Sequence, residues 1–138
     1  MAVKVLIVDD QPAFRTAARE VIAATDGFEV VGEAESGEES VVAARRLRPD
    51  LVLMDIQLPG IDGMEASRQI RSEQSDVVVF LLSTYDRENF ASRIGLSGAK
   101  TFIPKAAFGP ESLTDSWKAA LGQDSFSPPS KWQEGETG

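Results

Sequence analysis

Short apolar runs alternate along the chain with longer segments that carry apolar residues at helical spacing. The runs have the length of strands and cover Val3–Val8, Phe28–Val31, Leu51–Met54, Val77–Leu82 and Lys100–Pro104. Strands that are apolar almost throughout are typical of a parallel sheet covered on both faces. The pattern therefore predicts an α/β protein built from five strand–helix units.

Five helices are predicted to alternate with these strands. The first begins at Pro12, which suits this position because its missing N–H would have no helical partner there. Its apolar side chains recur at the spacing of one helix face: Phe14, Ala17, Ala18, Val21 and Ile22. The second begins with a capping pattern of Ser36 and Glu39 and continues to Leu47. The others are expected over Met64–Arg71, over Arg87–Ile94 with Gly95 and Gly98 as breakers, and from Pro110 through Leu121.

Length and composition indicate one soluble, cytoplasmic domain. The 138 residues are enough for one domain, and no stretch approaches the roughly 20 apolar residues of a membrane span. A net charge of −8 argues against non-specific binding to nucleic acid, which depends on lysine and arginine. We expect the domain to cover residues 1–122, and the polar residues 123–138 to form a flexible tail or the start of a linker.

Two residue types are missing from the sequence, and each absence excludes a kind of chemistry. Without cysteine the chain has no disulfide, no thiolate metal site and no thiol nucleophile. Without histidine it has no imidazole base and cannot carry a phosphohistidine of its own. Any phosphohistidine in its chemistry must therefore belong to a partner.

Polar residues of related chemistry follow four of the five predicted strands. They are Asp9 and Asp10 after the first, Asp55 after the third, Ser83 and Thr84 after the fourth, and Lys105 after the fifth. Because the carboxyl ends of parallel strands meet at one edge of a sheet, we expect these side chains to converge. Three carboxylates repel one another, and a hard cation such as Mg²⁺ removes that penalty. Together with hydroxyls and an ammonium, the set suits phosphoryl transfer to an aspartate.

The stretches that contain these residues also carry a family resemblance. They are Val8–Pro12, Leu53–Gly63, Leu82–Asp86 and Gly98–Lys105, with Phe28–Glu33 and Arg45–Asp50 as weaker supports. They resemble the receiver domains of two-component response regulators, and most of all the NarL/FixJ-type subfamily, over roughly residues 3–121. The resemblance implies a flavodoxin-like (CheY-like) doubly wound fold with five helices and a parallel sheet of strand order 2-1-3-4-5.

The resemblance also implies which residues carry out the chemistry. Asp55 would accept the phosphoryl group, and Lys105 would contact its oxygens. Asp9, Asp10, Asp55 and the backbone carbonyl of Gln57 would hold Mg²⁺, with Mn²⁺ as a substitute.

Further residues are implied to transmit or tune the signal. Ser83 takes the position of the switch hydroxyl, with Thr84 directly after it, and Phe102 takes that of the switch aromatic. Gln57 and Tyr85 flank the site and are expected to set the rate at which the acyl phosphate is hydrolysed.

The implied function is a phosphorylation switch and not an enzyme, with slow self-dephosphorylation. A sensor histidine kinase or a His phosphotransfer protein would supply the phosphoryl group. The output surface would consist of the fourth helix, the fifth strand and the fifth helix, and a homodimer through this face is left open. DNA would be bound only through a C-terminal domain that this chain does not contain. Whether the chain acts alone or belongs to a longer transcription regulator is also left open.

Two other classes of protein would be compatible with an α/β fold of this kind. An Asp-nucleophile phosphatase requires Asp-x-Asp at its nucleophile, whereas the sequence here is Asp55-Ile56-Gln57. A flavin-binding module of the same fold requires a phosphate loop rich in serine and threonine after the first strand, and none is present. The fold alone does not choose among these classes, but the residues of the site do.

Overall fold

The computed structural model describes residues 2–84 and 91–122, and these ranges form a three-layer α/β domain. Five parallel strands make one sheet in the order β2-β1-β3-β4-β5. The strands are β1 (Val3–Val8), β2 (Phe28–Ala34), β3 (Leu51–Asp55), β4 (Val78–Ser83) and β5 (Thr101–Pro104). The helices are α1 (Pro12–Ala23), α2 (Gly37–Leu47), α3 (Gly63–Glu73), α4 (Ala91–Ser97) and α5 (Pro110–Leu121), with a 3₁₀ turn, η2 (Lys105–Ala107), after β5. The predicted fold class and strand order are confirmed.

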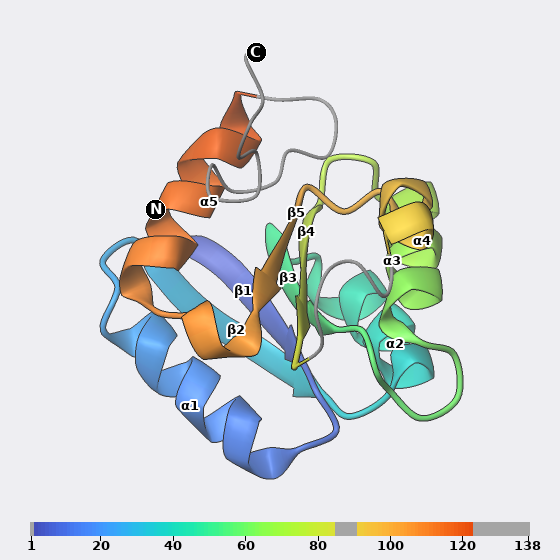
Figure 1. Ribbon diagram of the computed structural model, residues 1–138, viewed down its shortest axis with the longest axis horizontal. Coiled ribbons are helices and arrows are strands. Elements are labelled where there is room, and N and C mark those ends of the chain that lie inside the picture. Colours follow the sequence, from blue (N-terminus) through green and yellow to red (C-terminus); the bar gives the residue numbers. More distant parts are fainter. Residues whose placement is uncertain (1, 85–90, 123–138) are drawn as a thin grey trace.

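The helices cover both faces of the sheet (Figure 1). Helices α1 and α5 pack on one face, and α2, α3 and α4 pack on the other, so each face has its own hydrophobic cluster. All five residues of β3 and all six of β4 are buried, as expected for central strands covered on both sides. In the described part of the chain, no helix is long and apolar enough to cross a membrane.

The structure corrects three details of the predicted elements. Strand β2 continues to Ala34, three residues beyond the predicted end. Helix α4 includes Gly95 and ends at Ser97, because Gly95 only weakens a helix whereas Gly98, at φ +83°, leaves the helical region. The part of this helix predicted over residues 87–90 lies outside the described residues. Ala17 is exposed and does not join the core face of α1. That face consists of the buried Ala18 and Ile22, with half-buried residues beside them.

The capping pattern predicted at the start of α2 is present in a modified form. The Ser36 side chain accepts a hydrogen bond from the backbone N–H of Glu39 at 3.0 Å, as expected. The Glu39 carboxylate accepts from the N–H of Glu35, one residue before the expected donor, at 2.6 Å. Glu38 accepts from the N–H of Ile61 at 3.1 Å and so ties the start of α2 to the loop that follows β3.

The register of the sheet aligns the ends of four strands. Val8 lies opposite Met54, and Asp55 lies opposite Leu82 on the other side of β3. One residue further along, Ser83 lies opposite Pro104. The residues that follow β1 and β5, and those that end β3 and β4, therefore come together at one edge.

The turn from β3 into α3 is packed too tightly for a side chain at Gly63. Its N–H donates to the carbonyl oxygen of Ile56 at 2.8 Å, and the Ile56 N–H donates to Leu82 of β4 at 2.9 Å. A Cβ at Gly63 would overlap the backbone carbonyl oxygen of Asp55 and would lie 2.9 Å from the Cα of Ile56. This close approach holds the start of α3 against the backbone at the end of β3.

We predict that Gly63→Ala lowers the free energy of unfolding by about 1–3 kcal/mol, because backbone atoms and not a flexible side chain would have to move. Gly95→Ala is the matched control, since Gly95 is also helical but a Cβ there meets nothing within 4 Å. Alanine at Gly95 is expected to raise the free energy of unfolding by about 0.5–1 kcal/mol. Urea denaturation of both variants measures the difference, and an equal response of the two would contradict the packing argument.

Candidate functional site

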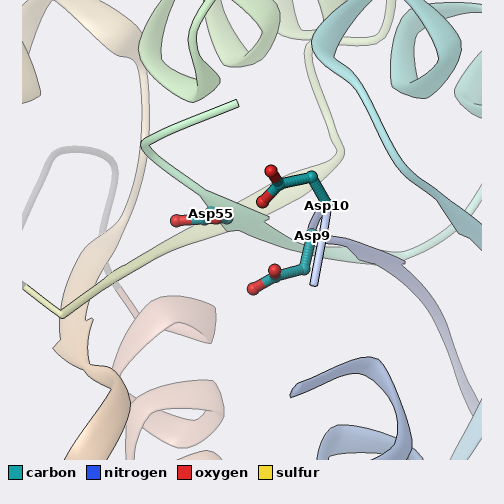
Figure 2. A group of neighbouring side chains, drawn as sticks. All are labelled: Asp9, Asp10 and Asp55. Atoms are coloured by element: carbon teal, nitrogen blue, oxygen red, sulfur yellow. The ribbon is translucent and has the colours of Figure 1, made fainter. Parts of the chain in front are cut away.

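Three carboxylates lie together at the carboxyl edge of the sheet. Asp9 and Asp10 follow β1, and Asp55 is the last residue of β3. One carboxylate oxygen from each lies within 4.8 Å of the others, and Figure 2 shows the three side chains reaching toward the same side. Asp9 and Asp55 are buried, at 1% and 4% exposure, whereas Asp10 is exposed. The structure thus brings together the acidic residues that the sequence pattern placed at strand ends.

Lys105 places a positive charge between two of these carboxylates. It follows β5 directly and opens the η2 turn, and its side chain is only 9% exposed. Its Nζ lies 2.7 Å from Oδ2 of Asp9 and 3.5 Å from Oδ2 of Asp55. Asp9 Oδ2 accepts no well-aligned hydrogen bond from the described residues, so this close contact acts through charge.

The two buried carboxylates are held in the same manner. Oδ1 of Asp9 accepts the backbone N–H of Gln11 at 2.8 Å, and Oδ1 of Asp55 accepts that of Gln57 at 3.2 Å. In each case the bond reaches two residues ahead and fixes the carboxylate to its own loop. The other oxygen of each carboxylate is left facing Lys105.

The pKa of Asp55 is raised from 3.8 to about 6. Burial is the main cause, and the nearby Asp9 carboxylate adds to it. The Lys105 ammonium and the Gln57 N–H act in the opposite direction and keep the pKa from rising further. Asp55 therefore titrates close to neutral pH, which is common for residues that react.

The oxygen ligands of this edge fit a hard divalent cation. Mg²⁺ prefers oxygen ligands at about 2.0–2.1 Å and keeps several waters, so three carboxylate oxygens from a partly exposed cluster suffice. When all three carboxylates are ionised, Lys105 leaves the group with two negative charges, which a divalent ion balances.

The other predicted site residues are placed at different depths. Ser83 is buried at the end of β4, and Thr84 after it is exposed. Phe102 is fully buried in the cluster under α2, α3 and α4. The Gln57 side chain is exposed, and Tyr85 lies outside the described residues.

An open cleft lies along the loop that follows β3. It has a volume of about 390 Å³ and is lined by Ile56, Gln57, Leu58, Asp62 and Arg93. Asp62 caps α3 by accepting the N–H of Glu65 at 2.9 Å, and its other oxygen lies 2.6 Å from Arg93 of α4.

Two residues that contact the site were not expected from the sequence. Phe14, predicted only as part of a core face, has its ring centroid 4.7 Å from Nζ of Lys105. Arg15 donates to the backbone carbonyl of Asp9 at 2.7 Å and to the Glu33 carboxylate at 3.1 Å, which ties the loop after β1 to the end of β2. Both residues lie in the first turn of α1, just after Asp9 and Asp10, and this position in the sequence could have indicated that they contact the site.

Comparison with known proteins agrees with this geometry. Residues 5–118 match the family described as the response regulator receiver domain. The response regulator GacA of Pseudomonas syringae is 42% identical over 105 residues, which are 76% of this chain and 49% of that protein. The transcriptional regulatory protein DegU of Brevibacillus brevis is 34% identical over 103 residues, 75% of this chain and 44% of DegU. The chain thus spans about half the length of these relatives.

Solved structures give the same result. A two-component response regulator of the LuxR family from an Aurantimonas species has a TM-score of 0.83 and 30% identity, and covers 97% of this chain and 95% of its own. The receiver domain of the putative response regulator NarL from Mycobacterium tuberculosis has a TM-score of 0.80 and 28% identity, and covers 88% of this chain and 98% of its own. The chain belongs to the response regulator receiver family, and it is a receiver domain of two-component signalling.

Proposed function

We propose that Asp55 accepts a phosphoryl group from a phosphohistidine on a sensor kinase or a His phosphotransfer protein. The observation that carries the proposal is the position of Asp55, a buried carboxylate with one oxygen fixed by Gln57 and the other facing Lys105. A carboxylate oxygen of Asp55 forms the new bond to phosphorus. The P–N bond to the histidine breaks, and its electron pair returns to the imidazole.

The surrounding residues lower the barrier mainly through charge. The Lys105 ammonium offsets negative charge on the transferring oxygens, which is the principal contribution a protein makes to phosphoryl transfer. Asp9, Asp10, Asp55 and the Gln57 carbonyl would hold Mg²⁺, with Mn²⁺ as a substitute, and this ion would neutralise further charge. Asp9 is fixed for this task by the N–H of Gln11 and by Arg15 on its own carbonyl oxygen.

The switch that follows is a shift between two packings of the domain. An acyl phosphate on Asp55 adds charge beside Ser83, which lies at the end of the adjacent strand, and favours the packing in which the hydroxyl contacts it. Phe102 is proposed to follow in the core, while Thr84, Gln57 and Tyr85 set how long the phosphoryl group stays. Water then hydrolyses the acyl phosphate slowly, so the domain works as a switch and not as an enzyme.

The surface proposed to change is formed by α4, β5 and α5. It carries two exposed leucines, Leu96 on α4 at 79% and Leu121 at the end of α5 at 67%. Contact with a protein partner, or with a second copy of the chain, is proposed to occur through this surface. The receiver unit is proposed to cover residues 1–122, with residues 123–138 as a tail or linker.

The longer relatives suggest the wider setting. DegU is a transcriptional regulatory protein, and the chain matches only its receiver-sized part. We propose that this receiver is of the NarL/FixJ type and controls transcription through a DNA-binding domain beyond the present chain. The Asp-nucleophile phosphatase is disfavoured, because Gln57 occupies the position where that class needs its second aspartate.

Chemical phosphorylation tests the proposal. Incubation with phosphoramidate and MgCl₂ is expected to add one phosphoryl group, which peptide mapping by mass spectrometry places on Asp55. Asp55→Asn is expected to abolish the labelling. Asp50→Asn is the matched control, because Asp50 precedes the opposite end of β3 and its side chain accepts the Lys4 N–H at 2.9 Å. An unlabelled wild type, or equal labelling of the Asp55 variant, would refute the assignment.

A further inference from the structure

The ammonium of Lys105 is bordered on one side by an aromatic ring. Nζ lies 4.7 Å from the ring centroid of Phe14, a residue in the first turn of α1. The same nitrogen contacts Asp9 and Asp55 at 2.7 and 3.5 Å, and the Lys105 side chain is 91% buried. Among the described residues, the buried ammonium therefore contacts two carboxylates through charge and one aromatic ring through a cation–π interaction.

The ring and the carboxylates attract the ammonium in different ways. Carboxylates attract the ammonium toward a fixed oxygen, and in this site they are also the ligands expected to bind a divalent cation. The face of an aromatic ring attracts a cation without a directed hydrogen bond, and it does not compete for the metal. Phe14 can therefore keep the Lys105 charge in place while the N–H groups exchange one oxygen partner for another.

The ring is itself held in place by the turn that Lys105 begins. The Phe14 N–H donates to the carbonyl oxygen of Gln11 at 3.1 Å, which fixes its backbone in the first turn of α1. Its ring packs on that of Phe108, with centroids 6.1 Å apart and an angle of 46° between the planes. The Phe108 N–H donates to the carbonyl oxygen of Lys105 at 3.2 Å. Backbone and rings thus form a closed path from Lys105 through Phe108 and Phe14 back to the lysine ammonium.

We propose that Phe14 is a positioning residue for phosphoryl transfer, which directs the Lys105 ammonium toward the group bound at Asp55. The inference rests on the proposed function, in which Asp55 accepts the phosphoryl group and Lys105 contacts its oxygens. It adds that the aromatic character of Phe14, and not only its volume, contributes to the rate. Leucine at this position keeps an apolar side chain in the cluster but removes the π face, whereas tyrosine retains it.

Phosphorylation kinetics of the full chain with phosphoramidate and MgCl₂ test the proposal. Phe14→Leu is expected to lower the rate constant about five-fold, which is the order of a partly buried cation–π contact, and Phe14→Tyr to restore it to within about two-fold of wild type. Phe28→Leu is the matched control, since Phe28 belongs to the same cluster and also pairs with an aromatic ring, Trp117, at 6.1 Å. Phe28→Leu is expected to leave the rate unchanged.

A double-mutant cycle and a spectroscopic signal separate positioning from packing. With Lys105→Met as background, Phe14→Leu is expected to have no further effect on the rate, because no ammonium is left to direct. In ¹H–¹³C spectra, the Lys105 ε-CH₂ resonance is expected to move downfield in Phe14→Leu, as the ring-current shift is lost, and to stay in place in Phe28→Leu.

The outcomes distinguish this inference from the function on which it rests. If the wild type takes no label on Asp55, the proposed function fails. The function stands if the wild type is labelled on Asp55 and Lys105→Met lowers the labelling rate. The inference about Phe14 is then wrong if Phe14→Leu has the same rate as Phe28→Leu. It is also wrong if Phe14→Leu lowers the rate by the same factor in the Lys105→Met background.

Discussion

Replacing Lys105 with methionine is expected to slow the phosphorylation of Asp55 by phosphoramidate about 100-fold at pH 7, the usual effect of removing one group that stabilises transition-state charge. The expectation follows from its position, with Nζ 3.5 Å from Asp55 Oδ2 in a side chain that is only 9% exposed. Methionine has a similar length and fills much of the same volume, so the variant mainly removes charge. Labelling rates under single-turnover conditions measure the effect.

The loss in Lys105→Met has two physical components that a pH profile separates. The ammonium stabilises the transition state, and it also lowers the pKa of the Asp55 carboxyl against the effects of burial and Asp9. Without it the pKa of Asp55 rises above about 6, and a smaller fraction of the carboxylate is ionised at pH 7. The second component is expected to disappear by pH 9, while the first remains.

The control is Lys118→Met on α5, an exposed lysine for which wild-type rates are expected. Lys105→Arg tests the importance of shape, because the planar guanidinium keeps the charge but is a poor substitute for a compact ammonium between two carboxylates. We expect it to recover only part of the rate. If Lys105→Met reacts at the wild-type rate across the pH range, Lys105 has no part in the transfer.

The parts of this protein that could be predicted from sequence depend on periodicity and on strand ends. Apolar runs identified all five strands, and the convergence of Asp9, Asp55 and Lys105 followed from one property of parallel sheets, that their carboxyl ends meet at one edge. The strand order came from the family resemblance, since hydrophobic periodicity shows which face of a strand is buried but not which strand is its neighbour.

The contacts within the site could not be predicted in this way. Whether Lys105 lies nearer to Asp9 or to Asp55 depends on differences of less than 1 Å, which result from the η2 turn and the packing around its long side chain. The helical spacing of Phe14 predicts that its side chain faces the core, but it does not predict whether the ring contacts an apolar side chain or an ammonium. Arg15 contacts both the carbonyl oxygen of Asp9 and the Glu33 carboxylate of β2, and the sequence does not show that these two groups lie side by side.

The burial that prepares Asp55 for reaction also makes the site unfavourable for folding when no cation is bound. A carboxyl whose pKa is about 6 in the folded protein and 3.8 when unfolded binds its proton more tightly in the folded state. The stability that this proton provides is fully present below pH 3.8 and is lost as the pH rises to about 6. At neutral pH the ionised Asp55 therefore lowers the free energy of unfolding by about 2–3 kcal/mol, since each unit of pKa difference corresponds to about 1.4 kcal/mol.

Asp55→Asn is accordingly expected to be more stable than the wild type by about 2–3 kcal/mol at pH 7.5 in EDTA, because asparagine has the shape of the protonated side chain and no charge. The difference should shrink as the pH falls from 6 and vanish near pH 4. Urea denaturation at several pH values measures it. Asp50→Asn, at an exposed acid beside the other end of β3, should show no such pH-dependent gain.

Added MgCl₂ extends the same test to the cation. An ion that binds the folded wild type raises its free energy of unfolding with concentration, and the negative charge that Asp55→Asn removes is part of what would bind it. Millimolar Mg²⁺ is therefore expected to narrow the gap between the two proteins at pH 7.5. A gap that persists unchanged at pH 4, or a wild type that Mg²⁺ does not stabilise, would contradict the view that repulsion and burial at Asp55 are relieved by a bound cation.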